Sequence, residues 1–127
     1  MEIRDPVALG YTRATISKWR EQLFYELGPA CVICGKRAHH LHEGILWRSE
    51  VMGFPFPTRL RVFADCNSFP LCRDCHVEPP PREVFFGIAC QKYGEDNVRR
   101  WYASLPWKCP PIKAFMPVEI NSANAHR

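Results

Sequence analysis

Two Cys-x-x-Cys turns constrain the fold of this 127-residue chain more than any other feature of its sequence. Cys31 and Cys34 form the first turn, and Cys72 and Cys75 form the second. Each turn presents two thiolates at the angle needed for one edge of a tetrahedron, so the two turns together supply four ligands to one zinc ion. A zinc site made of four thiolates has no open coordination position. We therefore expect a structural zinc that contributes to folding and activates no water.

The other cysteines and the chain's apolar content bear on its cellular compartment. The opening stretch MEIRDPVALG lacks the basic and apolar regions of a secretory signal, and no run of about 18 apolar residues is present. We therefore expect a cytoplasmic protein, in which metal binding explains paired cysteines better than disulfides do. A redox role would need only one such pair.

Cys90 is expected to be a small buried side chain, and Cys66 and Cys109 are expected to be free thiols.

Apolar periodicity predicts three helices. The first spans residues 12–27, with Thr12 as its N-cap and Gly28-Pro29 at its end, and its exposed face carries several basic side chains, Arg13, Lys18 and Arg20. The others span residues 82–93 and 95–105, with Gly94 between them. The side chains expected to face inward from these two are Val84, Phe85, Ile88, Ala89, Tyr93, Val98, Trp101, Tyr102 and Leu105.

The segments between these helices predict strands and loops. AHHLHEGILW, residues 38–47, is expected to hold a strand and its exit. TRLRVF, residues 58–63, alternates polar and apolar side chains as a half-buried strand does. Two prolines predict a loop for RSEVMGFPFP, residues 48–57. The prolines of VEPPP, residues 77–81, limit any helix begun at the second cysteine pair to about one turn.

Three of the five histidines lie in AHHLHE, residues 38–43. Because alternate residues of a strand share a face, His40 and His42 are predicted to point together, with His39 and Leu41 pointing away. A zinc ion that joins the two cysteine turns would place His76, the neighbour of Cys75, near the start of this strand. The histidines could then hold a second metal ion, or combine a metal ligand with a general base. His39 is expected to be an ordinary surface histidine.

These motifs together resemble a known family. A Cys-x-x-Cys turn, a histidine-bearing strand and Asn67 five residues before Cys72 resemble the HNH nucleases of the His-Me finger (ββα-metal) class. The segments HLHEGILWRS, NSFPLCRDCH and QKYGEDNVRRWYASLPWK are similar to small HNH proteins of phage genomes, and the resemblance covers about residues 31–105.

The resemblance implies an α+β fold, a small zinc-stabilised ββα-metal HNH domain flanked by N- and C-terminal helices. We expect one nuclease domain over residues 1–127. Its expected parts are an N-terminal helix within 1–28, a zinc-anchored finger core in 29–80, C-terminal helices in 81–106 and an irregular tail in 107–127.

The resemblance also implies a metal-dependent DNA endonuclease that hydrolyses phosphodiester bonds with one divalent ion, Mg²⁺, Mn²⁺ or Zn²⁺. His42 corresponds to the first histidine of the motif and would be the general base. Asn67 would orient that base through its amide or its backbone carbonyl, and His76 would ligate the catalytic ion.

The residue before the first motif histidine departs from the family pattern. Most relatives place Asp or His there as a metal ligand, but this chain has Leu41. His40, two residues back on the same face, is the preferred substitute as a ligand. In a second alignment His42 is the ligand and Glu43 is the base or a further ligand. In a third, His39 and His40 form the pair.

The charge of the chain bears on its partners. A net charge of +4 and a pI near 8.8 favour a polyanionic partner weakly. Arg48, Arg59, Arg61 and Arg73 lie in or near the expected finger and are candidates for DNA contacts, although each is equally compatible with a solvated surface.

Two other functions fit the same residues. One is a non-catalytic zinc-binding module that binds DNA, and the other is an accessory subunit of a phage DNA-processing complex. The phage resemblance implies cooperation with DNA-packaging proteins in the bacterial host cytoplasm. No membrane contact is expected, and the chain is expected to act as a monomer or a homodimer.

Overall fold

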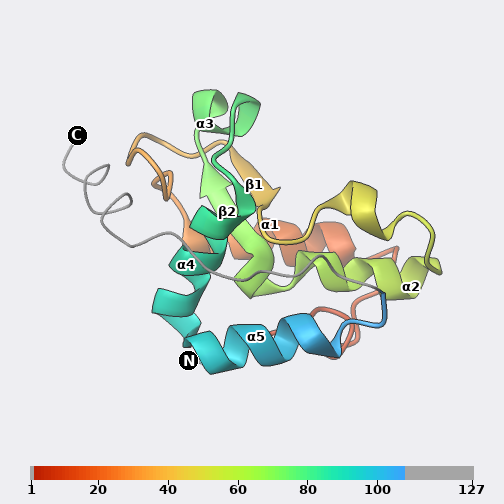
Figure 1. Cartoon of the computed structure of the whole chain (residues 1–127). Coiled ribbons are helices and arrows are strands. Elements are labelled where there is room, and N and C mark those ends of the chain that lie inside the picture. Colours follow the sequence, from red (N-terminus) through yellow and green to blue (C-terminus); the bar gives the residue numbers. More distant parts are fainter. Residues whose placement is uncertain (1, 108–127) are drawn as a thin grey trace.

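The computed structural model describes residues 2–107, which form an α+β fold of helices around a small sheet (Figure 1). Cys109 and the expected tail beyond Trp107 lie outside the described residues. In chain order, the α-helices, strands and 3₁₀ turns (η) are α1 (Ile16–Leu27), β1 (His40–Glu43), η1 (Arg48–Val51), α2 (Phe56–Arg59), η2 (Leu60–Phe63), η3 (Asp65–Asn67), β2 (Ser68–Leu71), α3 (Arg73–Val77), α4 (Arg82–Tyr93) and α5 (Glu95–Ser104). No helix within the described part of the chain has the length and apolar character needed to span a membrane.

The sheet consists of β1 and β2, which pair in antiparallel orientation with His42 opposite Phe69. All four residues of β2 are buried. Along β1 the environment alternates, because Leu41 and Glu43 are buried while His40 is exposed and His42 is half-buried. The two faces of β1 therefore lie in different surroundings.

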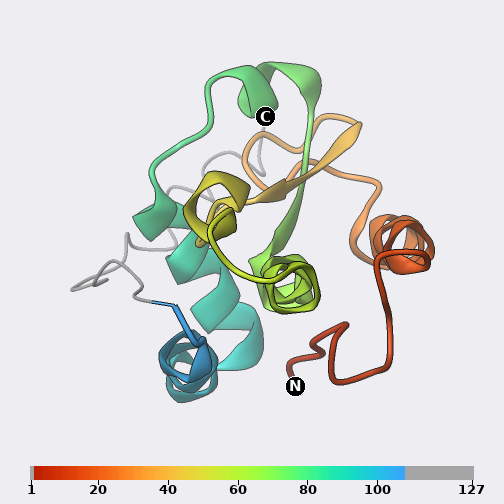
Figure 2. The ribbon, with the colours of Figure 1, turned by 90° about the vertical axis from the view of Figure 1, so that its right-hand side faces the viewer.

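Two apolar clusters cover these two faces. The larger joins Phe69 of β2 to Phe85 of α4 and extends to Trp101 of α5. The smaller packs Trp19 of α1, with Leu23, against Leu41 of β1. Consequently α1 packs on the Leu41 side of β1 and α4 on the His42 side, and Figure 2 shows these two helices on opposite sides of the strands.

The three predicted helices are present, with two different boundaries. The last, α5, ends at Ser104, one residue earlier than expected. The first begins at Ile16 rather than Thr12, because the Thr15 hydroxyl accepts a hydrogen bond from the Thr12 backbone N–H (2.9 Å) and holds residues 12–15 in turns. It ends before Gly28, as predicted. Gly94 separates α4 from α5 with a φ of 94°, a backbone conformation that favours glycine.

The predictions for residues 48–63 were wrong. The expected loop contains the 3₁₀ turn η1, and the expected strand over residues 58–63 lies in α2 and η2. Pro55 is the N-cap of α2 and Pro57 lies in its first turn, where a missing N–H costs no helical hydrogen bond. Leu60 and Val62 are buried as the alternation suggested, but their burial comes from packing in a helical segment instead of from pairing with another strand.

The prolines after the second cysteine pair have the expected effect. Helix α3 is five residues long and ends before Glu78. The next helix, α4, begins only after Pro81, which serves as its N-cap. This short α3 carries His76 directly after Cys75, and its position decides where that imidazole lies.

Candidate functional site

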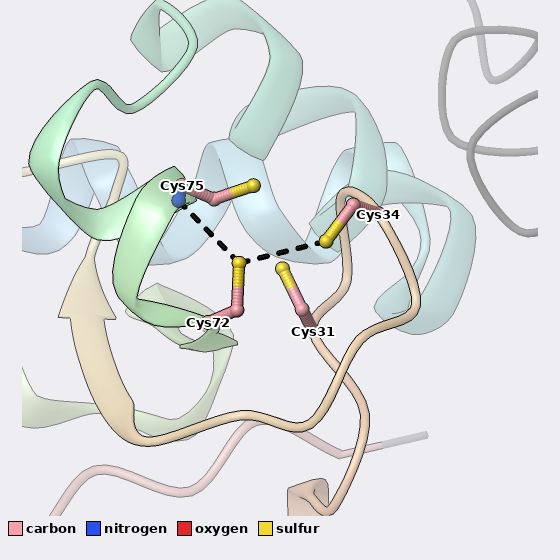
Figure 3. Close-up of side chains that lie close together, drawn as sticks. All are labelled: Cys31, Cys34, Cys72 and Cys75. Atoms are coloured by element: carbon pink, nitrogen blue, oxygen red, sulfur yellow. Dashed lines mark hydrogen bonds between the residues drawn. The ribbon is translucent and has the colours of Figure 1, made fainter. Parts of the chain in front are cut away.

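Four cysteines from two distant parts of the chain gather in one place (Figure 3). The sulfurs of Cys31, Cys34, Cys72 and Cys75 all lie within 4.8 Å of one another, and those of Cys34 and Cys72 are 3.5 Å apart. Tetrahedral zinc with Zn–S bonds near 2.3 Å requires sulfurs about 3.8 Å apart. The group fits a zinc ion and could hold a structural metal. Among residues 2–107 it is the one set of three or more Cys, His, Asp or Glu side chains gathered this closely.

The backbone around the two turns aims the sulfurs at one point. In the first turn, the Gly35 N–H donates to the Cys31 carbonyl (2.9 Å), and Gly35 has a φ of 80°. In the second, Cys72 is the N-cap of α3, and its sulfur accepts from the Cys75 N–H (3.4 Å). Burial disfavours the Cys31 thiolate, but backbone N–H groups, that of Cys34 first, outweigh it and lower the Cys31 pKa to about 7. This environment suits a thiolate ligand.

Three histidines meet beside this centre. The rings of His40 and His76 stack with centroids 4.5 Å apart, and the ring of His42 meets that of His76 edge-on at 5.5 Å. His42 also contacts the ring of Phe85 at 5.2 Å. His40 and His42 come from one face of β1, as strand alternation predicts. His76 comes from α3, as its place directly after Cys75 predicts.

Burial, followed by electrostatic repulsion between protonated His42 and His76, lowers the pKa of His42 to about 4. Desolvation also lowers the pKa of His40, and electrostatic repulsion from His76 is the next largest cause. Consequently, His42 is neutral at physiological pH. Its free ring nitrogen can accept a proton or bind a metal ion.

Glu43 lies on the other face of β1, away from the histidine cluster. Its side chain is 7% exposed and pairs with Arg20 (Nη2 to Oε2, 3.5 Å) and with Arg48. His39 lines a shallow hollow with Arg20 and Leu41, on the Leu41 side of the strand. The structure therefore brings His40, His42 and His76 together, and it brings neither His39 nor Glu43 to them.

Asn67 is fully buried, and its amide is used entirely by the backbone. Its oxygen accepts from the N–H groups of Ile45 and Leu46 (both 2.9 Å), and its nitrogen donates to the carbonyls of Leu46 (2.9 Å) and Val62 (2.7 Å). Its own carbonyl accepts from the Gly44 N–H (3.3 Å). The amide thus holds the chain where it leaves β1, directly after the histidines, and is not directed at His42.

The four arginines proposed for DNA contact differ in their surroundings. Arg61 pairs with Asp5 (2.7 Å) and donates to Ser104, and its side chain is 24% exposed. Arg73 is exposed on α3, beside His40. Arg48 and Arg59 each contact a phenylalanine ring. Internal contacts thus hold Arg61 in place, whereas Arg73 is the one of the four nearest the histidines.

The contacts of Arg20 were not predicted from the sequence. It was placed on a solvated helix face, yet it is half-buried, pairs with Glu43 and contacts the Phe63 ring. Desolvation lowers its pKa, with the nearby Glu43 carboxylate opposing that effect. The only available signal was its position one residue after the buried Trp19, on the edge of the apolar face of α1.

No family model matches the chain, and no curated protein or solved structure matches it significantly.

Proposed function

We propose that the protein is a metal-dependent DNA endonuclease of the HNH, His-Me finger type. The observation that carries this proposal is the convergence of three imidazoles, two from β1 and one from α3, next to a four-cysteine centre that can hold the fold by itself. A purely structural zinc domain needs no such cluster. The order of two antiparallel strands followed by a short helix is also that of the proposed finger.

His40 and His76 are the proposed ligands of the catalytic ion. Both imidazoles are exposed, and they lie side by side with ring centroids 4.5 Å apart. Two protein ligands leave coordination positions open for water and phosphate oxygens. Imidazole donors favour Mn²⁺ or Zn²⁺ over Mg²⁺. When bound, such an ion would polarise the scissile phosphate and stabilise the charge on the leaving oxygen.

His42 is the proposed general base. It is neutral at physiological pH and lies beside His76, so it would accept the proton of the attacking water next to the bound phosphate. Phe85 packs against one side of its ring and fixes its orientation. Asn67 is proposed as a positioning residue that holds the exit of β1, because its amide oxygen accepts hydrogen bonds from the backbone N–H groups of Ile45 and Leu46.

The geometry favours this assignment over its alternatives. Glu43 is engaged by two guanidinium groups on the opposite face of β1, so it is poorly placed to serve as base or ligand beside His42. His39 lines a hollow on that same opposite side. The arrangement with His42 as base and with His40 and His76 as ligands uses only side chains that contact one another.

Plasmid cleavage tests the function. We expect the folded, zinc-containing protein to convert supercoiled DNA to relaxed or linear forms when Mn²⁺, Mg²⁺ or additional Zn²⁺ is supplied, and to leave it intact without added metal. If no divalent ion supports cleavage by a protein that retains its zinc, the catalytic proposal is wrong. The non-catalytic DNA-binding module or the accessory subunit would then be the better assignment.

A further inference from the structure

A set of stacked side chains joins α1 and the turn before it to η1, α2 and η2. The guanidinium groups of Arg13 and Arg59 both lie over the Phe56 ring, at 4.5 and 5.5 Å from its centroid. Those of Arg20 and Arg48 both lie over the Phe63 ring, each at 4.9 Å. We call these six residues the arginine ladder. Figures 1 and 2 show α1, which carries Arg20, and α2, which carries Phe56 and Arg59, side by side.

The ladder concentrates positive charge. It holds four guanidinium groups, and within residues 2–107 the one carboxylate that pairs with any of them is Glu43, which is shared by Arg20 and Arg48. Among the described residues, neither Arg13 nor Arg59 has an ion-pair partner, although Arg59 donates through Nε to the Phe54 carbonyl (2.5 Å). Ordinary surface arginines are free to move, whereas these are ordered in advance by their phenylalanine rings.

The spacing of the ladder suits a nucleic-acid backbone. Its two rings are separated by α2 and η2, whose rises per residue place them about 12 Å apart along the chain. Phosphates advance about 3.4 Å per nucleotide along the axis of one DNA strand, so this separation covers roughly three to four nucleotides. Guanidinium groups that stack on aromatic rings still present N–H donors at their edges, in the fork geometry that binds phosphate oxygens.

We propose that the arginine ladder is a phosphate-binding surface for duplex DNA, separate from the histidine cluster and on the other side of β1. Arg13 and Arg59 supply its unpaired charges, and Arg20 and Arg48 extend it toward Glu43. This inference rests on the proposed function only for the choice of DNA as the polyanion. The role of the arginine ladder is to hold the backbone of the duplex, and this binding requires no cleavage.

The test is the salt dependence of binding to a labelled duplex, measured by fluorescence anisotropy without added divalent metal. Each phosphate contact contributes about 0.9 to the slope of log K against log salt. Arg13→Gln should lower the slope by about 0.9, and the Arg13→Gln, Arg59→Gln double variant by about 1.8. At 0.1 M salt the double variant should bind roughly 10- to 100-fold more weakly.

A matched control and a conservative variant separate charge from structure. Arg99 of α5 also lies over an aromatic ring, that of Phe86 (4.8 Å), and α5 is distant from α1 in Figure 2, so Arg99→Gln should change affinity less than about twofold. The Arg13→Lys, Arg59→Lys double variant keeps both charges and should keep the slope. If its slope falls as far as that of the glutamine variant, the positive charges at these two positions do not contact phosphate and the proposal is overturned.

Other results would also overturn it. The phosphate-binding proposal is overturned if the glutamine variants keep the wild-type slope or if the wild type does not bind duplex DNA. It is also overturned if the wild type binds anionic lipid vesicles in preference to DNA. If the double variant fails to fold, Arg13→Gln decides alone, because Arg13 is exposed and has no ion pair to lose within residues 2–107. Failure of the nuclease proposal looks different. The wild type would bind DNA with the predicted slope and would still cut no plasmid with any metal.

Discussion

Replacing Cys72 with Ser is expected to release the zinc ion and unfold the protein. Cys72 lies among the four sulfurs, caps α3 and is 4% exposed. Structural zinc contributes about 10–16 kcal/mol in small zinc domains, whereas a whole domain is typically stable by only about 5–15 kcal/mol. The loss of one ligand therefore outweighs the stability that the apolar core supplies. Metal content after gel filtration and far-UV circular dichroism check this result.

Cys90→Ser is the matched control for that experiment. Cys90 is also buried, but it lies on α4 in the large apolar cluster and not among the four sulfurs. Burial raises the pKa of its thiol to about 11, which keeps it protonated. Its replacement should cost about 1–2 kcal/mol and should leave one zinc per chain. If Cys72→Ser stayed folded without zinc while retaining the native spectrum, the structural role of the metal would be wrong.

The second large effect is expected at His42. His42→Ala should lower the rate of metal-dependent DNA cleavage by about 10²–10⁴, because it removes the side chain proposed to accept the proton of the attacking water. Zinc content should be unchanged, since the four sulfurs do not involve this side chain. The loss of the ring contact with Phe85 should cost no more than about 2 kcal/mol. Single-turnover cleavage of a labelled duplex and thermal unfolding check both parts.

Two variants on the opposite face of β1 control for that result. His39→Ala should cleave at nearly the wild-type rate, because His39 is exposed and lies away from the histidine cluster. Glu43→Gln should also keep most of its activity, although the loss of charge beside Arg20 and Arg48 should lower stability by about 1–3 kcal/mol. An inactive but folded Glu43→Gln protein would instead favour Glu43 as the base.

Much of the fold could be predicted because its signals are local. Pro81 and Gly94 delimit α4, and the apolar residues between them recur at helical spacing, so the expected bounds match those observed. The grouping of the histidines followed from strand alternation and from the place of His76 beside a cysteine turn. Local rules failed for residues 58–63, where a short alternating pattern fits a strand and a 3₁₀ turn equally well until tertiary packing decides.

The surroundings of individual side chains were harder to predict because their partners are distant in the sequence. Glu43 looked available for catalysis until the structure paired it with Arg20, which comes from α1. Asn67 was expected to orient His42 through its amide or its backbone carbonyl. Four hydrogen bonds with the backbone of Ile45, Leu46 and Val62 occupy the amide. Neither arrangement has a signal in the neighbouring residues.

The most direct test of the central claim is the location of an added divalent ion on the zinc-loaded protein. Mn²⁺ broadens NMR signals of nearby nuclei, so a titration followed on the imidazole resonances reports which rings it approaches. We expect strong broadening for His40 and His76, intermediate broadening for His42, and the least for His39. Broadening confined to His39, or none at any histidine while Mn²⁺ supports cleavage, would contradict it.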